Sequence, residues 1–459
     1  MKSLLSAVYP VFAVSVIIIG SVMPSYAEGI SAGIFDMDVT PPIGSQMAYD
    51  PVTSTWDMGL RAKGIVLLGA GEPIVVCAVD WIGIGNEGHD AFRAGLARGA
   101  GTSPARVAVH TVHQHDAPAC DFSAEAIARE FGIDPKIYDG TFARDILARL
   151  EQAVQTAVAG ARPVTHIGLG VAEVKEVASN RRILDASGNV SAVRFTTCKD
   201  PVLRAEPEGV IDPQVSLVSF WNDGTPLAVL SYYACHPQSY YRTGIPNPDF
   251  PGLARFMRQL AVPDALHIHF NGAGGNIGAG KYNDGAKENR LLLAERLADG
   301  MRRAWEATER FPVTPADVQW ETAPAALPVS PHITKAALEA TMSETSDPAT
   351  ILGGAATLAW LRRCEAGHPI DITCLSLGKA RILHLPGELF VEYQLAAKAM
   401  RPDLFVTMAA YGDYGTGYIG TARAYGEGGY ETGEKASKVA PEVEPVLMEA
   451  IKTLLSAGR

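Results

Sequence analysis

The chain has 459 residues and a formal net charge of −11. This acidic balance argues against proteins that bind nucleic acid or anionic membrane surfaces through a basic face. Hydrophobic residues make up 47% of the chain, which supplies a globular core and excludes an intrinsically disordered protein.

The first 27 residues have the pattern of a secretory signal peptide. Lys2 precedes a long apolar run, and Ser25, Tyr26 and Ala27 form the small-x-small end that precedes cleavage. We expect cleavage after Ala27 and export to the periplasm or the medium, with no stable membrane insertion afterwards. An uncleaved membrane anchor is the alternative, because the apolar run is long.

Strand-like and helix-like segments alternate along the rest of the chain. Apolar runs bounded by turn residues predict strands, and apolar residues at i, i+4 spacing predict helices. The expected strands and hairpins lie at 33–44, 65–81, 107–110, 164–177, 215–234, 266–270, 370–385 and 404–410. The expected helices lie at 87–99, 138–159, 252–260, 287–308, before 400 and at 448–455.

These elements predict an α/β fold with mixed sheets flanked by helices and a site at the carboxyl ends of strands. We expect a single domain over 28–459. Residues 314–331 are rich in Pro and Ala, and a helical insertion is expected at about 331–366. We find no internal sequence repeat.

Three histidines follow the apolar run at 107–110. They are His110, His113 and His115, and Asp116 comes next. In extended backbone His113 and His115 point to the same side, and neutral imidazole is the commonest metal ligand in proteins. The cluster therefore predicts a metal or acid/base site, with ordinary polar loop residues as the alternative.

Other polar residues also stand at strand ends. His236 follows the 215–234 hairpin, and Glu388 follows the last hairpin. Asp80 ends an apolar run, so it either faces a polar cleft or caps the next helix. The glycine-rich loop at 271–285 matches neither the P-loop pattern nor the GxGxxG pattern of dinucleotide-binding proteins. We therefore do not expect a nucleotide site.

The six cysteines include no CxxC pair, which argues against a structural zinc knuckle. In an exported protein Cys364 and Cys374 are close enough in sequence to form a disulfide. Cys77 lies within an apolar run and is expected to be a buried free thiol.

Five short segments lie at 38–42, 113–118, 236–239, 386–388 and 414–431. They resemble, in the same order along the chain, the motifs of the neutral/alkaline (non-lysosomal) ceramidase family, whose members are exported zinc amidases that hydrolyse N-acylsphingosine. The resemblance covers about residues 30–435. It implies the fold of that family's catalytic domain.

The resemblance also implies a Zn²⁺ site. Its ligands would be His113, His236, Glu388 and Tyr418, and nitrogen and oxygen donors suit zinc. Without the resemblance, Glu388 reads as a carboxylate near a helix start and Tyr418 as a packing aromatic.

Three further residues correspond to catalytic positions of the family. The resemblance gives His115 a role in acid/base catalysis or in transition-state stabilisation, and it places Arg181 and Tyr430 beside the reacting oxygen. The alternatives are a surface charge for Arg181 and a packing aromatic for Tyr430.

Two departures from the family pattern bear on the substrate. Gly278 stands where the family has a serine once assigned as a nucleophile, and the chain ends soon after Tyr430, where the family continues into a β-sandwich domain. We therefore expect a zinc hydrolase that cleaves an N-acyl bond of a lipid or small molecule by direct attack of water. The alternatives are a zinc hydrolase acting on an ester or small polar compound, and a non-catalytic exported binding protein.

Overall fold

The computed structural model describes residues 29–456. The signal peptide expected at 1–27 lies outside these residues. Among the described residues, no helix has both the length and the apolar character needed to cross a membrane.

The first of three large sheets contains the His113 segment. Its strands β1 (Ile30–Asp38), β2 (Arg61–Leu68) and β3 (Ile74–Val79) are antiparallel neighbours. Strand β5 (Val107–Thr111) then lies parallel to β3. All residues of β3 and β5 are buried, as expected for strands covered on both faces.

The other two sheets repeat this arrangement of three antiparallel strands and one parallel strand. In each, the fourth strand pairs with the third, so the sheet ends in a parallel pair. The second sheet contains β8 (His166–Glu173), β12 (Gln214–Asn222), β13 (Thr225–Tyr233) and β14 (Leu266–Asn271). The third contains β17 (Val318–Ala325), β18 (Ile370–Leu377), β19 (Ala380–His384) and β21 (Phe405–Ala409).

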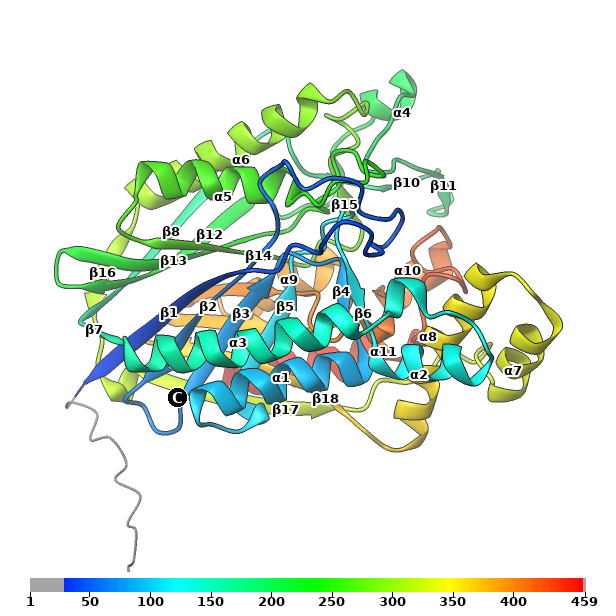
Figure 1. Ribbon diagram of the computed structural model, residues 1–459. Helices are drawn as coiled ribbons and strands as arrows, with labels where there is room; N and C mark the ends of the chain where they lie inside the picture. The colour runs from blue at the N-terminus through cyan, green and yellow to red at the C-terminus, as the bar shows by residue number, and fades with distance from the viewer. Residues whose placement is uncertain (1–28, 457–459) are drawn as a thin grey trace, which may run out of the picture.

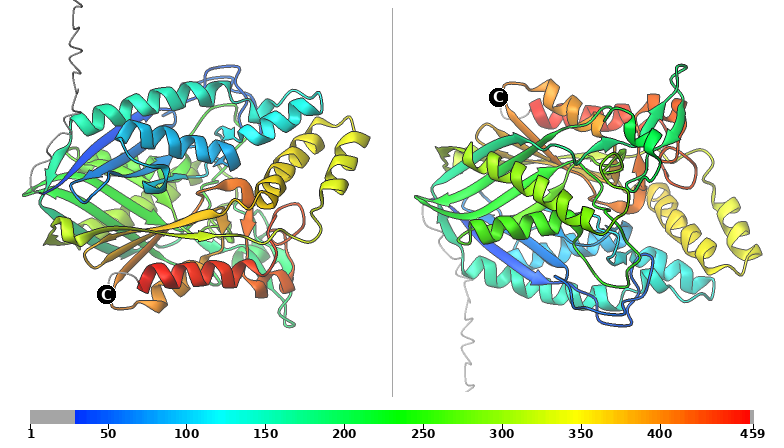
Figure 2. Two further views of the ribbon diagram at one scale, coloured as in Figure 1. Left: turned by 90° about the horizontal axis from the view of Figure 1, so that it is seen from below. Right: turned by 90° about the horizontal axis from the view of Figure 1, so that it is seen from above.

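Each sheet carries two helices on its outer face (Figures 1 and 2). One helix connects the two strands of the parallel pair, and the second follows the pair. The helix pairs are α1 (Asn86–Ala100) with α3 (Thr141–Ala159), α5 (Asp249–Ala261) with α6 (Glu288–Glu306), and α9 (Val391–Met400) with α11 (Val443–Ser456). The three units therefore share one topology, although the sequence has no visible repeat.

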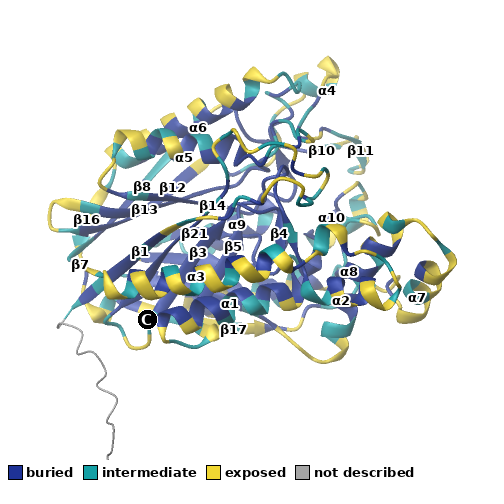
Figure 3. Ribbon diagram, in the orientation of Figure 1, coloured by how far each residue is buried: buried dark blue, intermediate teal, exposed yellow. Residues whose placement is uncertain are grey.

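The inner faces of the three sheets meet in one central core. Ile65, Val218 and Ile382 come from different sheets and are completely buried in the same cluster. The buried strands lie at the centre of the molecule in Figure 3. Removing such side chains from water stabilises the fold by about 1.5–3 kcal/mol each. This packing fixes the three sheets relative to one another.

Helices α7 (Lys335–Glu344) and α8 (Pro348–Glu365) lie between β17 and β18 in sequence. They pack against α2 (Phe122–Glu130) on the side of the molecule away from β7 (Figure 1). Asp347 caps α8 by accepting hydrogen bonds from two backbone N–H groups of its first turn.

Short elements complete the fold. The strands are β4 (Gly83–Ile84), β6 (Ala119–Cys120), β7 (Arg162–Val164), β9 (Ser179–Asn180), β10 (Arg182–Leu184), β11 (Val190–Val193), β15 (Ile277–Gly278), β16 (Glu309–Pro312), β20 (Glu388–Leu389) and β22 (Tyr418–Ile419). The short helices are α4 (Pro201–Ala205) and α10 (Ala422–Glu427).

The expected α/β architecture of mixed sheets flanked by helices is confirmed. One strand was not expected, and one expectation was wrong. The Pro/Ala-rich segment contains strand β17, which tolerates Pro324 because it is an edge strand. The possible Cys364–Cys374 disulfide does not form, because all six cysteines are free thiols. Cys77 is buried, as expected.

Candidate metal centre

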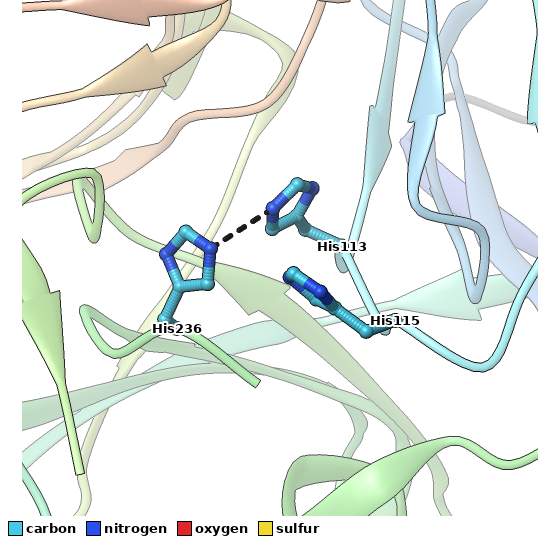
Figure 4. Close-up of side chains that lie close together, drawn as sticks. All are labelled: His113, His115 and His236. Atoms are coloured by element: carbon cyan, nitrogen blue, oxygen red, sulfur yellow. Dashed lines mark hydrogen bonds between the residues drawn. The ribbon is translucent and has the colours of Figure 1, made fainter. Parts of the chain in front are cut away.

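The carboxyl ends of one strand from each sheet bring the predicted ligands together. His113 follows β5, His236 follows β13, and Glu388 follows β19 at the start of β20. All three side chains are buried. Figure 4 shows the rings of His113 and His236 pointing toward one another, with His115 beside them. Residues from three sheets thus form one cluster.

Three donor atoms form a nearly equilateral triangle. The Nε2 atoms of His113 and His236 are 3.1 Å apart, and Oε2 of Glu388 lies 3.4 Å from the first and 3.5 Å from the second. For metal–ligand distances of about 2.0–2.1 Å, neighbouring ligands of tetrahedral zinc lie about 3.3–3.4 Å apart. The triangle therefore has the dimensions of one face of a zinc tetrahedron.

Hydrogen bonds to backbone carbonyls fix the orientation of both rings. Nδ1 of His113 donates to the carbonyl of Ile82 at 2.5 Å, and Nδ1 of His236 donates to that of Gly274 at 3.2 Å. In neutral rings this places the proton on Nδ1 and leaves a lone pair on each Nε2. A carbonyl partner on the second nitrogen is the usual support of a metal-binding histidine.

The electrostatics of the triangle favour a cation. Within residues 29–456, Oε2 of Glu388 has no hydrogen-bond partner although it is buried. Burial raises the pKa of Glu388, but the His113 ring and the phenols of Tyr414 and Tyr418 bring it below its ordinary value, so the group is a carboxylate. Burial, with the nearby His113 and Arg181, holds the pKa of His236 well below its ordinary value. A carboxylate and a neutral imidazole thus face the same point, and these residues fit Zn²⁺.

Tyr418 is placed beside Glu388 by the parallel pairing of β20 with β22. Its hydroxyl accepts a hydrogen bond of 3.1 Å from Nη1 of Arg181. Burial raises the pKa of Tyr418 well above its ordinary value, although the Arg181 charge opposes this. Arg181 itself is buried and pairs with Glu431 at 3.3 Å, so it is not a surface charge.

His115 is buried next to the triangle. Its ring centroid lies 5.0 Å from that of His113 and 5.3 Å from that of His236. Neither ring nitrogen has a hydrogen-bond partner among the described residues. Burial, with His113 and Arg181, holds its pKa well below the ordinary value, so the ring is neutral. His113, His115 and His236 together could hold a metal ion.

Tyr430 lies at the rim of the site. Its side chain is 49% exposed, and its ring contacts those of Tyr418 and Phe195 at centroid distances of 5.8 and 5.6 Å. The guanidinium carbon of Arg181 lies 5.7 Å from the centre of the Tyr430 ring. Tyr430 is thus next to the predicted ligand Tyr418 and accessible from solvent.

Two tyrosines at the site were missed in the sequence. Tyr414 donates a 2.6 Å hydrogen bond to Oε1 of Glu388, and Tyr411 stacks on His113 at 4.7 Å between ring centroids. Both belong to the Tyr/Gly-rich stretch at 411–430, and that composition was the signal that could have found them.

Several local expectations need correction. His113 does not lie in extended backbone, because its φ is +76°. His113 and His115 are neighbours through a loop turn instead of strand alternation. His110 lies outside the cluster, where its Nδ1 donates to the carbonyl of Ala410. Asp80 neither caps a helix nor faces a cleft, because it is buried in a two-bond ion pair with Arg255.

Comparisons with known proteins place this geometry in a known fold. No protein-family model matches the chain, and no curated protein matches it in sequence. Among solved structures it is similar to neutral ceramidase from Pseudomonas aeruginosa, with a TM-score of 0.64 and 16% identity over 94% of this chain and 75% of that chain. The protein has a neutral ceramidase-like fold.

A second solved structure, a ceramidase complexed with C2, gives a TM-score of 0.63 and 17% identity over the same shares of the two chains. The ceramidase-like fold that the five motifs implied is confirmed. At this level of identity the similarity concerns the fold, and the chemistry is argued from the residues of the site.

Proposed function

We propose that this protein is a Zn²⁺-dependent hydrolase that cleaves N-acyl (amide) bonds. The observation that carries the proposal is the buried triangle of His113, His236 and Glu388, with edges of 3.1–3.5 Å and a carboxylate oxygen that has no partner in the described part of the chain. Its place in a ceramidase-like fold supports hydrolysis of an amide.

The proposed ligands are His113, His236, Glu388 and Tyr418. Zinc bound there would polarise a carbonyl and lower the pKa of a bound water to about 7. Tyr414 and Arg181 hold Glu388 and Tyr418 in place through the hydrogen bonds described above. The chain therefore supplies both the donor atoms and their orientation.

The remaining residues manage protons and negative charge. His115 is neutral, and neither of its ring nitrogens has a partner among the described residues, so the ring can accept a proton from water and pass it to the leaving nitrogen. Arg181 is a buried cation, and Tyr430 presents a phenol at the rim. Both can stabilise negative charge as it develops on the carbonyl oxygen.

Ceramide is not the substrate we propose, because Gly278 stands where the resembled family has a serine. The exposed rings of Phe195 and Tyr430 beside Arg181 favour an apolar acyl group. We also propose export, which N-terminal sequencing of the mature protein tests. A start at or near residue 28 supports it, and an intact start at Met1 in the membrane fraction contradicts it.

Metal analysis and a substrate panel test the proposed function. Purified protein should contain about one zinc per chain and hydrolyse long-chain N-acyl amides faster than matched esters. His236→Ala and Glu388→Gln should each lose zinc and activity while the chain stays folded. His332→Ala is the control, because the ring of this exposed histidine bonds Ser330 and the carbonyl of Glu434, and neither of these is a proposed ligand. Full zinc content and activity in both variants would reject the site.

A further inference from the structure

The rim of the proposed site carries a second feature, the guanidinium of Arg242. We infer that Arg242 binds a carboxylate on the leaving half of the substrate, so that the preferred substrates are N-acyl amino acids. This inference rests on the proposed function and names the substrate class for it. It is carried by the position of Arg242, by its backbone and by its lack of an acidic partner within residues 29–456.

Arg242 is separated from His115 by one layer of aromatic rings. Its guanidinium carbon lies 5.2 Å from the centroid of Tyr49 and 5.8 Å from that of Tyr241. Tyr49 stacks on His115 at 5.6 Å with an interplanar angle of 10°, and Tyr241 meets His115 edge-on at 5.4 Å. The two tyrosines also contact one another at 4.8 Å. Tyr49 and Tyr241 therefore contact both the guanidinium of Arg242 and the proposed acid/base residue His115.

The backbone of Arg242 is held in an uncommon conformation. Its φ is +65°, a region that side chains other than glycine seldom adopt. Asp116 maintains it, because its Oδ1 accepts the N–H of Arg242 at 2.8 Å and its Oδ2 accepts the hydroxyl of Thr243 at 2.7 Å. Asp116 directly follows His115. His115 and Asp116 are thus consecutive, and Asp116 holds the backbone of Arg242. This arrangement gives the imidazole of His115 and the guanidinium of Arg242 a defined separation.

The charge of Arg242 is not neutralised by any residue that the structure describes. Within the described part of the chain no carboxylate forms an ion pair with it, whereas Arg181 pairs with Glu431 and Arg290 pairs with Asp249. Arg242 is exposed, so its outer face is open to a ligand. An exposed arginine is commonly a solvated charge. This one lies against two aromatic rings, and its backbone is held by Asp116, which restricts the side chain and lowers the entropy cost of binding a ligand.

A carboxylate suits this single guanidinium. The two parallel N–H groups of the fork match the two oxygens of a carboxylate, and an arginine held by aromatic rings keeps that fork free. The acyl chain would lie against Phe195 and Tyr430, and the amino acid would extend toward Arg242. Hydrolysis consumes one water: the C–N bond breaks, a C–O bond forms at the acyl carbon, and a proton goes to the leaving nitrogen. The products are a fatty acid and a free amino acid.

A matched pair of substrates tests the inference. N-dodecanoylglycine and N-dodecanoylethanolamine have the same acyl chain and amide but differ in a carboxylate against a hydroxymethyl group. The zinc-loaded enzyme should show a kcat/KM about tenfold higher for the glycine conjugate, which is the size expected of one charge-assisted contact. Arg242→Gln should lower the ratio of the two kcat/KM values to about one, mainly by raising KM for the glycine conjugate.

Two variants complete the design. Arg242→Lys keeps the positive charge but loses the pair of parallel N–H donors. It should therefore retain only part of the preference for the glycine conjugate. Arg302→Gln removes an exposed arginine from α6 and should leave the ratio near ten. Gln and Lys are unbranched and keep the N–H that Asp116 binds, so the loop is retained. A wild-type ratio near one, or an unchanged ratio in Arg242→Gln, would overturn the inference.

Direct binding separates this inference from the proposed function. If neither amide is hydrolysed, the proposed function fails, and titration calorimetry of N-dodecanoylglycine then decides the role of Arg242. Binding to the zinc-loaded protein that weakens about tenfold in Arg242→Gln supports it. Equal binding to both proteins, or no binding to the wild type, overturns it.

Discussion

The hydroxyl of Tyr414 donates a 2.6 Å hydrogen bond to Oε1 of Glu388, and this leaves Oε2 facing the two histidine Nε2 atoms. The phenol thereby selects which carboxylate oxygen is presented to a metal. Tyr414 belongs to a short turn that Asp413 caps, and the carbonyl of Asp413 accepts the N–H of Gly387. The turn and the ligand loop are thus fixed to one another.

Tyr414→Phe should weaken zinc binding by about 10- to 100-fold, which is typical for the loss of a partner that orients a ligand. The phenyl ring keeps its packing against His113, so the chain should stay folded. Competition with a chromogenic chelator measures the affinity. Tyr425→Phe is the control, because its hydroxyl contacts Ser437 and no proposed ligand. Equal zinc affinity in both variants would show that Tyr414 does not orient Glu388.

Water should attack the substrate directly, without an acyl-enzyme. Ser239 lies near His236 in the sequence, but it is completely buried, and its hydroxyl donates to Asp249 at 3.0 Å while accepting from Arg290 at 2.9 Å. Single turnover in ¹⁸O-labelled water should place the label in the product acid. Intact-protein mass spectrometry should find no adduct at any time, and a transient adduct on any side chain would refute direct attack.

Gly278→Ala should destabilise the protein by about 1–3 kcal/mol through overpacking. A Cβ at this position would lie 2.8 Å from Cγ2 of Thr196, so the hydroxymethyl group of a serine has no room either. Thr196→Ser removes that methyl group but keeps the hydroxyl that donates to Gln238. Denaturant unfolding of the two single variants and the double variant should show that Thr196→Ser recovers most of the loss. Strictly additive effects would exclude this steric account.

Stability should fall as the pH rises from about 4 to about 7 because of Asp121. Burial is the largest cause that raises the pKa of Asp121, from 3.8 to about 7, and Asp413 adds to it, whereas Ala124, Asn86 and Lys438 oppose it. The folded state then holds this proton more tightly than the unfolded state, so stability is lost as the pH rises through this window. The loss is at most about 4 kcal/mol.

Asp121→Asn should remove this part of the pH dependence. The amide oxygen can still accept the N–H of Ala124. Nδ2 of Asn86 donates to Oδ2 of Asp121 in the wild type, so the Asn86 amide must turn over in the variant. Its Oδ1, which has no partner in the described chain, then accepts from the new amide. Melting temperatures across pH 4–8 compare the variant with the wild type. An identical slope in both proteins would show that Asp121 is not the titrating group.

Much of the secondary structure was predictable because it depends on local patterns. The hairpin expected at 215–234 is β12 with β13, and the helix expected at 138–159 is α3. Helix α2 and strand β17 were missed. The first is short and begins after a loop, and the second contains a proline that only its edge position allows.

The sequence by itself placed histidines and a glutamate at the ends of apolar strands, and with them the residue types of a metal site. The tertiary structure alone decided which of these residues meet. Backbone hydrogen bonds between strands are nearly the same for every residue type, so nothing local encodes that three sheets share one topology. That topology brings His113, His236 and Glu388 within 3.5 Å, leaves His110 outside and buries Asp80 in an ion pair.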